Sequence, residues 1–185
     1  MPLSDIRLAR IQRASAWLHL VLTALLPGIP LLLALGWALI PDAQLGDSLG
    51  LKMMPGAQPC PLTLLDRTMG FGASLLLPTG VILYGVWHLR ALFGLYARGI
   101  ILGPDNAERL QALAMTLILW VPAQMLGDIV VSLAMSLDNA AGERFVAISL
   151  SSNDVAIALV GAVALVISWV MVEAARAAED SSSII

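Results

Sequence analysis

Long apolar runs bounded by charged residues dominate the pattern of this chain. They cover residues 16–40, 68–88, 110–136 and 154–174. A helix of about 20 apolar residues crosses a hydrocarbon core of roughly 30 Å. Lipid offers no hydrogen-bond partner to backbone groups, so spanning segments of this kind are helical. The pattern therefore predicts an all-α integral membrane bundle of four transmembrane helices, with residues 1–185 forming a single domain.

The first apolar run also has features of a secretory signal peptide, because Arg7, Arg10 and Arg13 precede it. However, the apolar part of a signal peptide is only about 7–15 residues long. This run is longer, and Pro27 and Pro30 interrupt it. We therefore expect a first helix that is retained.

The segments that connect the apolar runs differ in kind. Residues 41–67 form the longest connection and are rich in proline and glycine, which predicts an irregular external loop. Residues 89–109 keep helical spacing. We therefore expect the second helix either to extend beyond the bilayer or to be followed by an interfacial helix. Residues 175–185 form a tail.

Local signals predict where several helices begin and end. Gly99 and Gly103 are expected to end the extension of the second helix, because glycine is favoured just after a helix. Asp105 with Glu108 matches a capping box at the start of the third helix, and Ser151 with Asp154 matches one at the start of the fourth.

Composition supports the membrane class and excludes several others. Of the 185 residues 59% are apolar, and only 12% are charged, against roughly 25% in soluble domains. The mean hydropathy is +0.87. These values exclude a soluble enzyme, a disordered chain and a basic protein that binds nucleic acid directly.

Basic residues are unevenly distributed between the two sides of the predicted membrane. Seven of the ten lie on the side that holds both termini, namely Arg7, Arg10, Arg13, Arg90, Arg98, Arg109 and Arg176. The other three, Lys52, Arg67 and Arg144, lie on the opposite side. Because cytoplasmic loops are enriched in lysine and arginine, both termini are expected in the cytoplasm.

Few residues offer recognisable cofactor or catalytic chemistry. Cys60 is the single cysteine; it excludes a dithiol redox pair and is either an inert thiol or a cross-link between two subunits. His19 and His88 could together hold one haem or metal, or could be interfacial histidines hydrogen-bonded to head groups or backbone. No phosphate-binding or hydrolase motif is present. We predict no enzymatic activity, no cofactor and no metal.

Asp128 is the charged residue that falls well within an apolar run, and intramembrane carboxylates are costly and often functional. Gln124 lies one helical turn away on the same face, so the two form a candidate polar intramembrane site. The alternative is structural, with Asp128 reaching the outer interface and pairing with Arg67, Lys52 or Arg144.

Two stretches resemble an uncharacterised bacterial membrane family, a domain of unknown function with four predicted spans. Residues 89–113, LRALFGLYARGIILGPDNAERLQAL, are similar to its L..LF..Y..G.iF...N pattern. Residues 149–185 are similar to its fourth helix and its Vm.EA..l.eE ending. Leu102 departs from the aromatic usual in the family, and Asp180 from its Glu or Asn.

The resemblance implies a bacterial inner-membrane location but no established reaction. Family members are often encoded beside a small Cro-type helix-turn-helix regulator, which implies such a regulator as a cytoplasmic partner. The matching residues form a candidate cytoplasmic interaction surface, which would be either a docking site or a structural collar: Phe93, Tyr96, Gly99, Asn106, Glu173 and Glu179.

Two functions follow from these observations. The first is a membrane-embedded interaction or regulatory module that uses the cytoplasmic surface. The alternative is a small transporter or channel component that uses Asp128 and Gln124. Small residues four apart on the last helix, such as Ala158 and Ala162, are compatible with a homo-oligomer.

Overall fold

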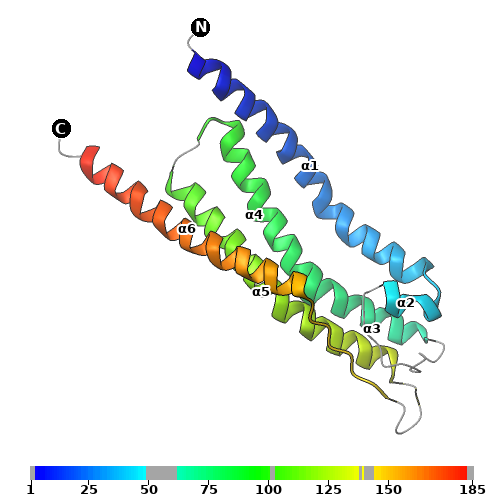
Figure 1. Cartoon of the computed structure of the whole chain (residues 1–185). Helices are drawn as coiled ribbons and strands as arrows, with labels where there is room; N and C mark the ends of the chain where they lie inside the picture. The colour runs from blue at the N-terminus through cyan, green and yellow to red at the C-terminus, as the bar shows by residue number, and fades with distance from the viewer. Residues whose placement is uncertain (1–2, 49–61, 101–102, 138, 140–143, 183–185) are drawn as a thin grey trace. The chain divides into compact units, whose positions relative to one another are not determined.

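A computed structural model describes residues 3–48, 62–100, 103–137, 139 and 144–182. Helices account for most of these residues: α1 (Leu3–Leu39), α2 (Asp42–Ser48), α3 (Leu64–Ser74), the π-helical turn η1 (Leu75–Thr79), α4 (Gly80–Ala97), α5 (Pro104–Met135) and α6 (Ser152–Ser182) (Figure 1). No strand occurs in these ranges. The predicted all-α class is confirmed.

The described residues contain four helical stretches that are long and apolar enough to cross a membrane: Leu8–Leu39, Leu64–Ala97, Pro104–Met135 and Ser152–Ala174. The protein is therefore a multi-pass membrane protein. Each stretch contains most of one predicted apolar run and begins earlier, because the helix continues through the polar residues that precede it. The second stretch continues to Ala97, so the helix is extended as expected.

Contacts along the chain divide it into two compact units. Unit 1 comprises Met1–Pro27, Leu83–Ile118 and Ala156–Ile185, and unit 2 comprises Gly28–Ile82 and Leu119–Val155. Each is described separately below.

In unit 1, single glycines allow helices to approach closely. A Cβ atom at Gly85 of α4 would lie 2.8 Å from Cγ2 of Thr116 on α5. A Cβ atom at Gly161 of α6 would lie 2.8 Å from Cβ of Leu117. Close packing of membrane helices through small residues is common. The close contact on α6 is made by Gly161, whereas Ala162 of the expected Ala158–Ala162 pair is exposed.

The helix ends of unit 1 agree in part with the sequence signals. Gly99 has a φ of +84°, and its amide donates to the Tyr96 carbonyl at 3.0 Å. The Ile100 amide donates to Leu95 at 3.1 Å, which completes a Schellman ending at the predicted residue. Helix α5 begins at Pro104, which needs no hydrogen-bond acceptor at a first helical position. Asp105 therefore lies inside the first turn rather than at the predicted cap.

Unit 2 is built around a small apolar core. Its residues come from the last turn of α1, from α2, from α3, from the end of α5 and from the segment 144–150. Its buried residues are Trp37, Leu45, Ala73, Val131, Met135 and Ala147. Leu45 is 1% exposed and lies on α2. The prediction of irregular structure after residue 41 is thus wrong for Asp42–Ser48, because burial of Leu45 favours a helix there.

Unit 2 also contains the break between α3 and α4. Pro78 lies inside η1 and has no amide hydrogen for the helical ladder. A Cβ atom at Gly127 of α5 would lie 2.9 Å from Cδ of Pro78, so α5 passes close to this turn. Single π-helical turns are frequent at functional sites, and this one borders the cavity described next.

Candidate functional site

Polar side chains at four-residue spacing mark one face of α5 in unit 2. They are Gln124, Asp128 and Ser132, and Ser136 continues the spacing directly after the last residue of α5. Residues four apart share a helix face. Asp128 is 4% exposed, and both serines are 0% exposed. This polar face points into the protein.

An extended segment, residues 144–150, lies along that face. The Ser136 hydroxyl donates to the Phe145 carbonyl at 3.2 Å, and the Ala147 amide donates to Oγ of Ser132 at 2.9 Å. The Ser149 amide donates to Oδ2 of Asp128 at 2.9 Å. Four helical residues rise about 6 Å and two extended residues about 6.6 Å, so the two spacings match. The α5 side chains thereby satisfy backbone groups of a non-helical segment beside a membrane helix.

Asp128 takes both of its contacts from neutral donors. Besides the Ser149 amide, Nε2 of Gln124 donates to its Oδ1 at 3.1 Å. The two residues of the candidate polar site are thus in contact. In the structural alternative, Asp128 would form an ion pair with Arg67, Lys52 or Arg144. Arg67 instead bonds to Asp42, Arg144 is exposed, and Lys52 lies outside the described residues. Asp128 forms no ion pair with any residue that the structure describes.

A cavity of about 170 Å³ lies against Asp128 in unit 2. Its polar and aromatic wall comprises Ser74, Thr79, Trp120, Gln124 and Asp128. The rest of the wall is formed by Leu33, Pro78, Ile82, Gly127 and Val131. Ligand sites are usually apolar cavities with a few convergent polar groups, and this cavity has that composition. It can hold a small solute beside a carboxylate, a carboxamide and two hydroxyls.

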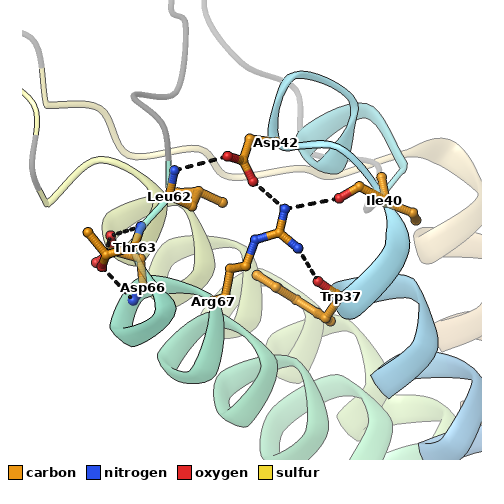
Figure 2. Close-up of polar contacts among 7 residues, drawn as sticks. All are labelled: Trp37, Ile40, Asp42, Leu62, Thr63, Asp66 and Arg67. Carbon is orange, nitrogen blue, oxygen red and sulfur yellow. Dashed lines mark hydrogen bonds and ion pairs between the residues drawn. The ribbon is translucent and has the colours of Figure 1, made fainter.

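A second polar cluster of unit 2 joins the end of α1 to α3. Figure 2 shows the Arg67 guanidinium between the carbonyls of Trp37 and Ile40 and the carboxylate of Asp42. The bond from Nη2 to the Ile40 carbonyl is 3.1 Å long, and the Leu62 amide donates to Oδ2 of Asp42 at 3.1 Å. Arg67 therefore caps the last carbonyls of α1, which carry partial negative charge.

This cluster shifts the acidity of Asp42. Burial alone would raise the pKa of the Asp42 carboxyl. The hydrogen bond from Arg67, the bond from the Leu62 amide and the guanidinium charge together lower the pKa below its ordinary value. Asp42 thus stays ionised to a lower pH than a free aspartate.

Two capping boxes begin helices α3 and α6. The Ser151 amide and hydroxyl both donate to Oδ2 of Asp154 at 2.7 Å, as the sequence predicts. The Thr63 amide donates to Oδ2 of Asp66 at 2.9 Å, and the Asp66 amide returns a bond to the Thr63 hydroxyl (Figure 2). Sequence reasoning missed this second box, although Thr-x-x-Asp is the same signature.

The residues of the candidate cytoplasmic interaction surface have different surroundings in unit 1. The Phe93 and Tyr96 rings meet edge to face with centroids 6.0 Å apart, and both are half-buried. Asn106 is 1% exposed and donates from Nδ2 to the Ile100 carbonyl at 3.0 Å. Gly99 forms the helix ending described above. The Glu173 side chain is exposed.

For Glu179 and Cys60, the side chains lie outside the described residues. Glu179 falls within α6, whereas the whole of Cys60 lies outside these residues. Phe93, Tyr96 and Glu173 thus present side chains at least partly to the surface, whereas Asn106 supports the α4–α5 connection from inside. Whether the surface binds a partner stays a prediction.

The two histidines of unit 1 have separate partners. Nδ1 of His19 lies 2.9 Å from the Arg90 carbonyl. Nδ1 of His88 accepts from Arg109 at 3.2 Å, and its ring lies 4.4 Å from that of Tyr84. These contacts fit hydrogen-bonded histidines rather than a shared ligand site. In the described part of the chain, no three His, Cys, Asp or Glu side chains gather as potential metal ligands.

In comparisons with known proteins, no family model, curated sequence or solved structure matches the chain.

Proposed function

We propose that this protein binds a small polar solute within the membrane, at the Asp128 cavity, as a transporter or channel component. It acts in a bacterial inner membrane with both termini in the cytoplasm. The observation that carries the proposal is that Asp128 and Gln124 are in contact and both line one cavity. A buried carboxylate that borders a cavity in a membrane helix is typical of substrate and ion pathways.

The membrane setting strengthens this interpretation. Asp128 lies within the candidate span Pro104–Met135, and the cavity wall also includes residues of the spans Leu8–Leu39 and Leu64–Ala97. Three spans therefore meet around one polar group. Discontinuous or kinked helices often surround solute sites near the bilayer midplane, and the π-helical turn with Pro78 supplies such an irregularity here.

Thiol labelling tests whether water-soluble molecules reach the cavity. In a Cys60→Ala background, Thr79→Cys should react with a small methanethiosulfonate reagent added to membranes. The matched control is Thr116→Cys, because Thr116 is 8% exposed, Thr79 is 7% exposed and only Thr79 lines the cavity. We expect rapid labelling at position 79 and slow labelling at 116. Equal, slow labelling at both positions contradicts the proposal.

A second candidate function is the membrane-embedded regulatory module with a cytoplasmic docking surface. The edge-to-face pair of Phe93 and Tyr96 favours it, because half-buried aromatic residues are common in protein interfaces. A small Cro-type regulator should then co-sediment with membranes that carry the wild-type chain and not with a Phe93→Ala, Tyr96→Ala variant. Co-sedimentation that survives both substitutions would refute this surface.

A further inference from the structure

We propose that the Asp128 cavity selects a small monovalent organic cation, of the alkylguanidinium or alkylammonium class. The inference rests on the proposed solute-binding function and adds the chemical class of the solute. Three features of the cavity carry it: the sign of its charge, the missing counter-charge of its carboxylate, and its size and wall.

The ionisable side chain of the described cavity wall is an acidic one. Among the lining residues that the structure describes, Asp128 is ionisable, and none is Lys, Arg or His. Low-dielectric surroundings strengthen the field of a single charge, because little water screens it. An anion would meet only repulsion from Asp128, whereas a cation would be attracted.

Within the described residues, the carboxylate of Asp128 has no counter-charge of the kind that Asp42 has. Asp42 pairs with Arg67, while the described contacts of Asp128 come from the neutral Gln124 side chain and the Ser149 amide. Burial of an unpaired charge is costly, and a paired charge is far better tolerated. A cation bound in the cavity would supply the missing partner.

The dimensions of the cavity set the size of the cation. An engineered cavity of about 150 Å³ holds one benzene molecule, and this cavity is about 170 Å³. It therefore accommodates an organic cation of roughly that size, which is larger than a bare metal ion or ammonium. The apolar wall of Leu33, Ile82 and Val131 suits the alkyl part of such a cation.

The remaining polar groups suit a donor of N–H bonds. Gln124 uses its Nε2 toward Asp128, so its Oε1 is the acceptor that this bond leaves unused. The Ser74 and Thr79 hydroxyls add further acceptor oxygens to the wall. Trp120 contributes an indole ring, the side chain that interacts best with cations through its face.

Titration calorimetry on the purified full-length protein in lipid nanodiscs tests the selection. The probes are n-propylguanidinium, its neutral isostere n-propylurea, and the anion valerate, which are matched in size. We expect saturable binding of n-propylguanidinium and at least about tenfold weaker binding of the other two, since a charge-assisted contact is lost. Asp128→Asn should weaken binding of n-propylguanidinium to the level of n-propylurea.

Two further variants separate charge from structure. Asp105→Asn is the matched control, because it removes an equal charge from an exposed residue in the first turn of α5, and it should leave binding unchanged. Trp120→Leu keeps Asp128 and its contacts, so it tests the site even where Asp128→Asn fails to fold. We expect about threefold weaker binding of n-propylguanidinium in Trp120→Leu.

The outcomes distinguish this inference from the proposed function. If n-propylurea or valerate binds as tightly as n-propylguanidinium, the cation class is refuted and the solute site survives. If no probe binds while Thr79→Cys is labelled, the inference again fails alone. If no probe binds and Thr79→Cys is not labelled, both the inference and the proposed function fail.

Discussion

Asp42 and Asp128 of unit 2 differ in what neutralises them. Asp42 follows α1, keeps 29% of its side chain exposed and pairs with Arg67. Asp128 lies inside α5, is 4% exposed and receives only neutral donors among its described contacts. The more buried of the two carboxylates is thus the one for which the described part of the chain supplies no cation, which reverses the arrangement expected if burial alone determined pairing.

The difference indicates different roles. Arg67 on α3 binds the carbonyls at the end of α1 and the carboxylate of Asp42 (Figure 2). The two charges of this ion pair therefore neutralise each other and stabilise the fold. Asp128 borders a cavity, so its charge is available to a solute. The predictions below should separate a structural charge from an available one.

The largest effect on stability is expected for Arg67→Ala. This substitution removes the Arg67 donor from the carbonyls of Trp37 and Ile40. It also removes the cationic partner of Asp42, which keeps the Leu62 amide as a donor. Loss of a buried charged partner typically costs about 3–5 kcal/mol. Because Arg67 is 24% exposed, water replaces part of the lost contact, and we expect about 2–3 kcal/mol. Unfolding in mixed micelles, followed by circular dichroism, measures the change.

Arg144→Ala is the matched control, since it removes the same charge from an exposed residue of unit 2. It should change stability by less than about 0.5 kcal/mol. Equal free energies of unfolding for the Arg67 and Arg144 variants would show that the Arg67 cluster does not stabilise the fold.

The next largest effect concerns the packing beside the Arg67 cluster. A Cβ atom at Gly70 would lie 2.7 Å from Cζ3 of Trp37, whose side chain is 4% exposed. Gly70→Ala should therefore destabilise the protein by about 1–3 kcal/mol, the usual cost of overpacking. Gly72→Ala meets nothing within 4 Å and should stabilise α3 by about 0.5–1 kcal/mol through helix propensity. Changes of the same sign in both variants would contradict this account.

The sequence predicts the long helices well because a bilayer requires apolar runs of a certain length, whatever the packing inside them. It predicts the Ser151–Asp154 box for a similar reason, since all of its atoms lie within four residues. Helix α2 and the break at Pro78 are less predictable, because tertiary contacts of Leu45 and Gly127 contribute to them.

The candidate site shows the same limit. Gln124 and Asp128 are recognisable as a pair, because helical spacing alone brings them together. The Ser149 amide is 21 residues from Asp128 in sequence. That contact depends on where the extended segment lies along α5, which no local pattern specifies. Arg67 is likewise one of three possible partners of Asp128 in the sequence, whereas in the structure it forms an ion pair with Asp42.

A smaller effect concerns pH. The folded pKa of Asp42 is lower than its ordinary value of 3.8, so its pair contributes stability above that pH. The contribution is lost as the pH falls through the lower pKa of the folded state. The wild type should therefore be more stable than Asp42→Asn at neutral pH, and the two should converge in acid. A difference that stays constant down to pH values well below the ordinary pKa would refute this coupling.

Between the two compared sites, the smaller stability effect is expected at Asp128, for Asp128→Asn, although this substitution should have the largest effect on binding. Asparagine keeps an oxygen that accepts from the Ser149 amide, and rotation of the Gln124 amide restores the second bond. The substitution also removes a buried charge that has no cationic partner in the described structure, which offsets any weakening of these bonds. We expect the free energy of unfolding to change by less than about 1 kcal/mol in either direction. Unfolding of Asp128→Asn beside Asp42→Asn under the same conditions measures this. If Asp128→Asn unfolds as readily as Arg67→Ala, the carboxylate of Asp128 holds the extended segment in place, and its charge is structural like that of Asp42.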